Sequence, residues 1–315
     1  ITLPGAINGL NNFLEPDFSV LLNPDVWIDA YGQVFFTLSL GFGIMIAYAS
    51  YLPKKSDVVN NAFITAFANS GFSFLAGLGV FGVLGYMAQA QGVAFGEIAS
   101  GGIGLAFIAF PKAINLLPAF QGIFGALFFL SLVISGLSST MSLIESFSSS
   151  IMDKFAMERK KAITIVCGVG FTGSLIFATG LGLGILDVID HFINAYGLAV
   201  VGFVECIVIG YLWDVNKVKD HVNRVSDFKV GSWWNFSIKV ITVLGLGYML
   251  IRKVIREAGP LLAGNFDKLY GGYPVSAILS LGWGLVLGII VVAYMMRHVK
   301  WNQDVNLSHQ PLEEE

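Results

Sequence analysis

Seven long apolar runs constrain the fold of this chain more than any other sequence feature. They cover approximately 26–52, 62–88, 119–151, 162–181, 190–213, 233–251 and 274–296. A helix of about 20 mainly apolar residues crosses a hydrocarbon layer about 30 Å thick, and it satisfies its own backbone hydrogen bonds there. The sequence therefore predicts an all-α, polytopic membrane protein. Its 315 residues are expected to form a single membrane domain, 1–315, with seven transmembrane helices.

The overall composition argues against several functional classes. Only 12% of the residues are charged, against about 25% in soluble domains, and the mean hydropathy is +0.74. A formal net charge of −3 predicts no nucleic-acid partner. Cys167 and Cys206 lie in apolar runs and predict neither a disulfide nor a metal site. The G-x-G-x-x-G match at 168–173 falls inside a predicted span, and no other catalytic motif is found, so no enzyme is predicted.

The distribution of basic residues predicts the orientation. Lys and Arg concentrate in cytoplasmic loops of membrane proteins, and twelve of the 18 lie on one side of the predicted spans against five on the other. With seven spans, this makes 297–315 a cytoplasmic tail, 92–118 an extracellular loop with short helices, and Ile1 an outside residue. The expected location is the plasma (cytoplasmic) membrane. A chain seldom begins outside without a signal or an earlier span, so for a cytoplasmic native N-terminus we expect an odd number of spans upstream of Ile1.

The stretch FFTLSLGFG, at 35–43, is unusually polar and glycine-rich for mid-membrane depth. Ser39 and Gly43 make a small-xxx-small pair that would let two unbroken helices pack closely. Alternatively, Gly41 and Gly43 favour a broken helix at about 39–43, because glycine adopts unusual dihedral angles. The facing ends of two half-helices could hold a cation and a carboxylate together, as in transporters with broken helices.

A serine-rich face follows in the run at 119–151. Ser135, Ser138, Ser139 and Ser142 recur at helical spacing. Two of the hydroxyls would lie near the carbonyl of Ser135, and three neutral oxygens suit a monovalent cation. The spacing fits equally well with serines that bond their own helix carbonyls or a neighbouring helix.

Several acidic residues lie in or beside the predicted spans, where charge is costly. Glu205 is in mid-span and is interpreted as a buried structural acid, with a direct role in transport as the alternative. Asp187 and Asp190 lie at the predicted outer mouth, and Asp153 lies at the cytoplasmic end of the serine-rich helix. Each aspartate is consistent with plain surface charge and with half of a gating salt bridge.

Four of these stretches resemble one transporter family, the neurotransmitter:sodium symporters, and most closely their bacterial amino-acid transporters. VWIDAYGQVFFTLSLGFGIMIAYASY resembles the sixth helix and ANSGFSFLAG the seventh. SGLSSTMSLIE with Asp153 resembles the eighth, and LDVIDHF with GFVE the tenth. The resemblance implies that the chain is helices six to twelve of a twelve-helix inverted-repeat fold, with the first five helices missing.

The resemblance also implies a role for each matching position. For the substrate pocket it implies Phe36, Ser39, Gly41, Phe42, Ser139 and Leu143. For the first sodium ion it implies Thr37 and Asn69, and for the second Ser135, Ser138 and Ser139. For the outer gate it implies Asp190, and for the inner gate Asp153 braced by Tyr51. Both sodium sites would be incomplete without the missing first helix.

One position distinguishes members of that family. Chloride-independent members often carry a glutamate one turn after the asparagine of the seventh helix, and here that position is Ser73. A neutral serine cannot supply the negative charge that this glutamate would place next to sodium. Four residues are therefore interpreted as a chloride site. They are Gln33, Thr37, Asn69 and Ser73.

The expected function is sodium-coupled import of an amino acid by alternating access. Phe42 and Leu143 favour an apolar or aromatic substrate side chain. The expected partners are the substrate, the lipid bilayer and the missing helices, and a homodimer is an open alternative. An ion channel or pore-forming fragment is the competing interpretation, since it would also show glycines and hydroxyls in mid-membrane.

Overall fold

The computed structural model describes residues 3–53, 55–98, 104–266 and 269–301, and every regular element among them is helical. The elements before the first long helix are α1 (Ala6–Leu14), η1 (Phe18–Leu22), α2 (Pro24–Thr37) and α3 (Ile44–Ala49). Those of the middle are α4 (Val58–Gln91), α5 (Phe95–Ile98), η2 (Leu105–Ala109), α7 (Phe110–Asn115), α8 (Gln121–Phe155), α9 (Arg159–Ser174) and η3 (Leu175–Ala178). The next are α10 (Gly182–Phe192), η4 (Ile193–Leu198), α11 (Ala199–Ile207), η5 (Val208–Leu212) and α12 (Val215–Val225). The last are α13 (Ser232–Phe236), η6 (Ser237–Thr242), α14 (Val243–Leu262), η8 (Tyr270–Gly272), α15 (Val275–Ala277), η9 (Ile278–Trp283) and α16 (Gly284–His298).

Within the described residues, five helices are long and apolar enough to cross a membrane. They are Val58–Gln91, Gln121–Phe155, Arg159–Ala178, Gly182–Leu212 and Val275–His298. Each overlaps one of the seven apolar runs of the sequence. The chain is therefore an all-α, multi-pass membrane protein, as predicted.

Two predicted spans take a different form. The run at 26–52 is divided into α2 and α3, which are separated by a break. The run at 233–251 lies in the continuous helical stretch formed by α13, η6 and α14, which is not among the five apolar helices. That stretch carries Asn235 and Lys239 near its start and Arg252 and Lys253 further on, all of them polar or charged. Of the predicted tail 297–315, residues 302–315 lie outside the described part of the chain.

The described chain groups into two compact units. Unit 1 comprises 1–38, 54–138 and 206–244, and unit 2 comprises 39–53, 139–205 and 245–315.

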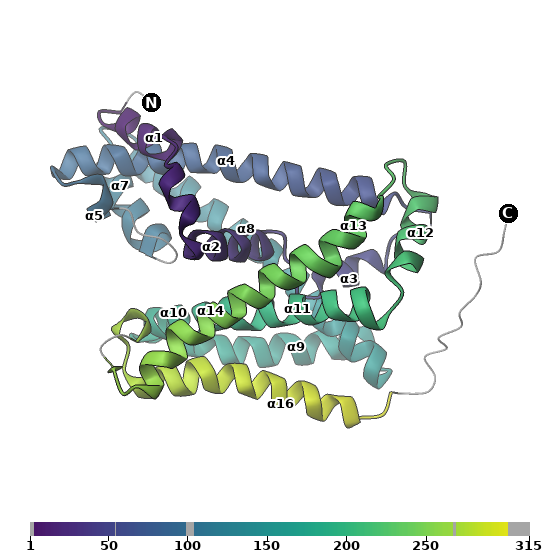
Figure 1. The fold of residues 1–315 in the computed structure, drawn as a ribbon. Helices are drawn as coiled ribbons and strands as arrows, with labels where there is room; N and C mark the ends of the chain where they lie inside the picture. The colour runs from purple at the N-terminus through teal and green to yellow at the C-terminus, as the bar shows by residue number, and fades with distance from the viewer. Residues whose placement is uncertain (1–2, 54, 99–103, 267–268, 302–315) are drawn as a thin grey trace. The chain divides into compact units, whose positions relative to one another are not determined.

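Unit 1 is built on the close approach of α1 to α4 (Figure 1). Glycines make this approach feasible, because a Cβ added to Gly9 would lie 1.9 Å from the carbonyl oxygen of Phe81. A Cβ on Gly85 would lie 2.5 Å from the carbonyl oxygen of Gly5. Any larger side chain at either glycine would force the two backbones apart. Beyond this contact, the end of α4 packs against α5, η2 and α7 through a small core that includes Leu84 and Met87.

The beginning of α4 is fixed to the segment after α12, also in unit 1. Asp57 caps α4 by accepting a hydrogen bond from the backbone of Asn60 at 3.0 Å. The other carboxylate oxygen accepts the backbone N–H of Asp227 at 3.0 Å. Ser226, which is buried, accepts the N–H of Val59 at 3.1 Å. One aspartate therefore holds two chain segments 170 residues apart.

Unit 2 has a core of aromatic and branched residues. Phe192 and Ile278 are almost completely buried, and Trp283 packs against Phe192 with ring centroids 5.4 Å apart. Gly282 admits the ring of Phe192, because a Cβ there would lie 2.7 Å from it. This core joins α10 and η4 to η9. The apolar helices Gly182–Leu212 and Val275–His298 therefore pack against each other.

Several helices contain π-helical turns, in which a residue bonds to the fifth residue before it. In the described residues these turns are η2, η4, η5, η6 and η9. Two of them, η4 and η5, lie in the single apolar helix Gly182–Leu212. Such turns are uncommon and are frequent at functional sites.

Candidate ion and substrate site

The backbone between α2 and α3 leaves the helical conformation at 38–43. Three residues there have positive φ, with values of 54° at Ser39, 78° at Gly41 and 72° at Gly43. The left-handed region costs an L-residue roughly 1–2 kcal/mol and costs glycine much less. Two glycines therefore permit the break, and Ser39 bears the strain. The predicted broken helix at about 39–43 is confirmed, and the alternative of one unbroken helix is wrong.

On the unit 1 side of the break, Thr37 is the last residue of α2. Its hydroxyl donates a hydrogen bond to the side-chain oxygen of Asn69, in the first half of α4, at 3.2 Å. Gln33 lies one turn before Thr37, and Ser73 lies one turn after Asn69. The structure thus brings together the two residues predicted for the first sodium ion. The two further residues of the predicted chloride site lie one turn away on the same helices.

On the unit 2 side of the break, the chain packs against α8. The hydroxyl of Ser146 donates to the carbonyl oxygen of Phe42 at 2.9 Å. A Cβ on Gly43 would lie 2.8 Å from that same hydroxyl oxygen. A Cβ on Gly41 would lie 3.3 Å from the carbonyl oxygen of Leu198 in η4. The glycines therefore serve both the backbone dihedral angles and close packing.

Tyrosines continue the contact of this segment with α8 and α9. Tyr48 and Ser142 share a hydrogen bond of 2.7 Å between their hydroxyls. The hydroxyl of Tyr51 donates to Glu145. Arg159, at the start of α9, binds both oxygens of Glu145, at 3.0 and 2.7 Å.

The sequence patterns do not predict the arginine of this cluster. Tyr51 was expected to brace Asp153, yet its hydroxyl lies on Glu145 and within 3.3 Å of a guanidinium nitrogen of Arg159. A signal was present, since a lone glutamate in an apolar helix needs a cation. Arg159 is the first basic residue of the next helix, and a short connection returns it to Glu145.

The serine face lies on α8 as the spacing predicted. Ser135, Ser138 and Ser139 fall within little more than one turn and are exposed, with Leu143 one turn further on. Phe36, near the end of α2, is also exposed. Their proposed contacts to sodium and substrate stay predictions.

The acidic residues have varied surroundings. Asp190 is exposed and accepts a hydrogen bond from Asn194 at 2.9 Å, one turn later on the chain. Asp153 is exposed near the end of α8, whereas Glu205 is partly exposed. In the described residues, no group of three His, Cys, Asp or Glu could hold a metal ion.

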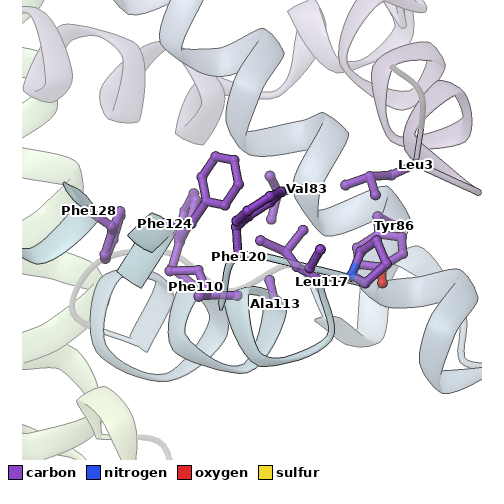
Figure 2. Close-up of a pocket in the computed structure, with 12 residues that line it drawn as sticks. Leu3, Val83, Tyr86, Phe110, Ala113, Leu117, Phe120, Phe124 and Phe128 are labelled. Atoms are coloured by element: carbon purple, nitrogen blue, oxygen red, sulfur yellow. The ribbon is translucent and has the colours of Figure 1, made fainter. Parts of the chain in front are cut away.

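An apolar cavity of about 510 Å³ lies elsewhere in unit 1, between α4, α7 and α8. Phenylalanines 110, 120, 124 and 128 contribute to its lining (Figure 2). Tyr86 also lines it, and its hydroxyl is bonded to the carbonyl of Leu116. None of the described residues that line it is charged or belongs to the predicted site. This cavity is therefore distinct from the predicted ion and substrate positions.

Comparison with known proteins decides the family. The model of the sodium:neurotransmitter symporter family matches residues 1–304. The chain belongs to the sodium:neurotransmitter symporter family. This confirms the family that the four sequence stretches resemble, and it agrees with the helical, multi-pass architecture.

Three relatives illustrate this family membership. An uncharacterized sodium-dependent transporter of Methanocaldococcus jannaschii is 44% identical over 302 residues, which are 95% of this chain and 60% of that protein. The sodium- and chloride-dependent taurine transporter of Rattus norvegicus is 34% identical over 92% of this chain and 47% of its own length. The sodium- and chloride-dependent creatine transporter 1 of Bos taurus is 33% identical over 84% of this chain and 42% of its own length. The chain thus spans about half the length of the relatives it matches.

Proposed function

We propose that the full-length protein is a sodium-coupled symporter that imports an amino acid by alternating access. The observation that carries the proposal is the helix break at 38–43, with Thr37 bonded to Asn69 at its edge. Non-helical backbone at membrane depth is tolerated where it is buried in protein or lines a polar cavity. In transporters with broken helices, such gaps bind the substrate and the coupling ions.

The ion sites of this proposal use neutral oxygens. Thr37 and Asn69 supply side-chain oxygens for the first sodium ion. The carbonyl of Ser135 and the hydroxyls of Ser138 and Ser139 supply three for the second. Oxygen donors suit hard cations, and neutral ones suit a singly charged cation because they add no excess charge. Both sites take further ligands from upstream helices.

The substrate pocket of this proposal lies at the break itself. Ser39 and Gly41 offer backbone groups to the carboxylate and the amine of an amino acid. Phe42 and Leu143 provide apolar surface, which favours an apolar or aromatic side chain, and Phe36 covers the pocket. Relatives named for taurine and creatine transport show that the substrate panel must also include these compounds.

Chloride is proposed as a further ion of the site. Ser73 lies one turn from Asn69 and carries no charge, so a bound chloride would balance the sodium ion beside it. Gln33, Thr37, Asn69 and Ser73 would be its neighbours. Relatives named as chloride-dependent support this assignment.

The gating residues of this proposal are the aspartates near the helix ends. Asp190 would form the outer gate and Asp153 the inner gate, each with an upstream arginine. Tyr51 would act through Glu145 and Arg159, to which the structure joins it. Glu205 is proposed as a structural acid.

The test is uptake of labelled amino acids, taurine and creatine into proteoliposomes that contain the full-length protein. We expect saturable uptake that requires an inward sodium gradient. Uptake should also rise with an inside-negative membrane potential, because moving one charge through 100 mV is worth about 2.3 kcal/mol. Uptake that is indifferent to sodium would overturn the proposal. Conductance that does not saturate would favour an ion channel instead.

A further inference from the structure

Exposed aromatic residues lie where η5 meets the start of the next helical stretch, within unit 1. Tyr211 and Trp213, at the end of the apolar helix Gly182–Leu212, are 59% and 63% exposed. Trp233 and Phe236 of α13 are exposed as well. Tyrosine and tryptophan at the ends of membrane helices are typical of the level of the lipid headgroups. This part of unit 1 therefore lies at the edge of the bilayer.

Lys239 places a cation at this level. The residue lies in η6, inside an apolar run. Its stem lies on Gly210, where an added Cβ would be 3.2 Å from the lysine Cγ, and its ammonium lies 6.0 Å from the centre of the Tyr211 ring. The Tyr211 hydroxyl donates back to the Lys239 carbonyl at 2.6 Å. Long cationic side chains in membrane helices reach the surface in this way, with the stem in apolar surroundings.

The short helix α12, between these two helical stretches, is amphipathic. One of its faces is formed by buried and half-buried valines, namely Val215, Val218, Val222 and Val225. Lys217 and Arg224 lie two turns apart on the opposite face, with His221 between them, and all three are exposed. Because the valines hold the helix against the protein, the basic face is turned outward.

A hydrogen bond fixes α12 beside the start of α13 (Figure 1). Asn235 of α13 donates to the side-chain oxygen of Asn216 at 2.8 Å. Asn216 directly precedes Lys217, and Asn235 lies one turn before Lys239. The bond therefore ties the helix that carries Lys217 to the helix that carries Lys239. The cationic face is defined here as Lys217, Arg224 and Lys239.

Carboxylates balance the charge of this region only in part. The segment 211–239 contains five Lys or Arg against three Asp. Lys229 is engaged by its own loop, where its ammonium donates to two backbone carbonyls. Asp214 caps α12 by accepting the N–H of Asn216 at 3.0 Å. Within the described residues, no member of the cationic face forms an ion pair. Its positive charge is therefore available to an anion from outside the chain.

We propose that the cationic face binds the phosphate of an anionic phospholipid at the edge of the bilayer. Basic residues directly beyond a membrane helix attract anionic headgroups, and each cation contributes about fivefold in affinity, which is about 1 kcal/mol. A lipid fits better than a soluble anion, because the exposed Tyr211 and Trp213 offer apolar surface to the same molecule. This lipid site goes beyond the proposed function and does not depend on it.

Native mass spectrometry of the full-length protein in mild detergent tests the site, because it counts the lipids that are bound. We expect the wild type to bind phosphatidylglycerol at least about tenfold more tightly than phosphatidylcholine with the same acyl chains. A variant that combines Lys217→Gln, Arg224→Gln and Lys239→Gln should lose one of the tightly bound phosphatidylglycerol molecules. Equal affinities of the wild type for the two lipids would overturn the proposal, and so would an unchanged number of bound molecules in the variant.

Two further variants control for net charge and for side-chain loss. One removes three exposed lysines elsewhere in the chain and should keep the lipid; it combines Lys55→Gln, Lys112→Gln and Lys300→Gln. The other exchanges the type of cation and should also keep the lipid; it combines Lys217→Arg, Arg224→Lys and Lys239→Arg. Loss of the lipid in the first control would show that only net charge matters and would overturn the site. If the neutral triple variant does not fold, Lys217→Gln and Arg224→Gln decide singly, since both positions are exposed.

Competition separates a lipid from other anionic partners. Glycerol phosphate carries the anionic group without acyl chains, and in large excess it should leave the lipid bound. Displacement by glycerol phosphate would assign the cationic face to a soluble anion, and displacement by a polyglutamate peptide would assign it to an acidic protein. Either result overturns the lipid site. None of these measurements uses sodium-driven uptake, so failure of the lipid site and failure of the proposed function are distinguishable.

Discussion

The hydroxyl of Ser146 on α8 donates a hydrogen bond of 2.9 Å to the carbonyl oxygen of Phe42. The broken segment has lost its helical hydrogen bonds, and this contact replaces one of them. The replacement comes from a helix about 100 residues later in the chain. The conformation of the break therefore depends on α8 as well as on its own glycines.

Removal of this bond should destabilise the break. In Ser146→Ala, the half-buried Phe42 carbonyl loses this hydrogen bond, and loss of one such bond typically costs about 0.5–1.5 kcal/mol. We expect a lower Tm for the full-length protein in detergent. Ser150→Ala is the control, since its hydroxyl bonds the carbonyl of Ser146 in its own helix. Equal Tm values for the two variants would contradict the role of the bond.

Glycine should be required at 43 and not at 32. Gly43→Ala places a side chain at φ 72° and 2.8 Å from the Ser146 hydroxyl, so we expect a loss of at least about 1–2 kcal/mol. Gly32→Ala lies inside α2 with no atom within 4 Å of the new Cβ, and should gain about 0.5–1 kcal/mol. Adding Ser146→Ala to Gly43→Ala should relieve the steric part, which a double-mutant cycle of Tm values measures. Strict additivity would show that the two residues do not collide.

The sequence predicted the break but not its partners. Gly41 and Gly43 indicate the break within a run that otherwise suits one helix, because the backbone freedom of glycine is a property of the residue itself. The positions of Ser146, Leu198 and Arg159 depend on how distant helices return to the break, and no spacing within 35–43 reports that. The pair Thr37–Asn69 is predicted from the family resemblance. The structure shows a hydrogen bond between the two residues, and their separation of 32 residues in the sequence does not by itself predict it.

Loss of the Thr37–Asn69 pair should weaken the response to sodium. Thr37→Val keeps the shape and removes the hydroxyl, and Asn69→Ala removes its partner. Each should raise the sodium concentration for half-maximal uptake about tenfold, which corresponds to about 1.4 kcal/mol. The double variant should cost less than the sum, because the two residues act on one ion. Ser131→Ala, whose hydroxyl bonds the carbonyl of Phe128 in its own helix, is the control. An unchanged sodium response would remove both residues from the proposed ion site.

A fixed negative charge at 73 should replace chloride. Ser73→Glu places a carboxylate one turn from Asn69, and we expect uptake that no longer depends on external chloride. The measurement compares uptake in chloride and in gluconate at constant sodium. Ser73→Gln matches the size without the charge and should not restore uptake in gluconate. Persistent chloride dependence in Ser73→Glu would refute the site.

Acid should act on the cap of α4. The backbone N–H of Asp227, together with groups of Asn60 and Ser226, holds the pKa of the Asp57 carboxyl below its ordinary value. A depressed pKa gives stability that is present above the ordinary carboxyl pKa of about 4 and is lost as pH falls through the folded value. Tm should therefore fall between pH 5 and 3 more steeply in the wild type than in Asp57→Asn. Asp29→Asn, at an exposed position of α2, should keep the wild-type slope. Parallel curves for the wild type and Asp57→Asn would rule out this source of acid sensitivity.

The π-helical turns at Ile193–Leu198 and Val208–Leu212 mean that one span behaves as several short helices joined end to end. A π turn holds about one residue more than an α turn, so side chains beyond it are rotated by about 100° from the phase that precedes it. Asp190 and Glu205 lie on opposite sides of the first turn and do not share one helical wheel. A substitution scan through this span therefore has to be read with its phase reset at each turn.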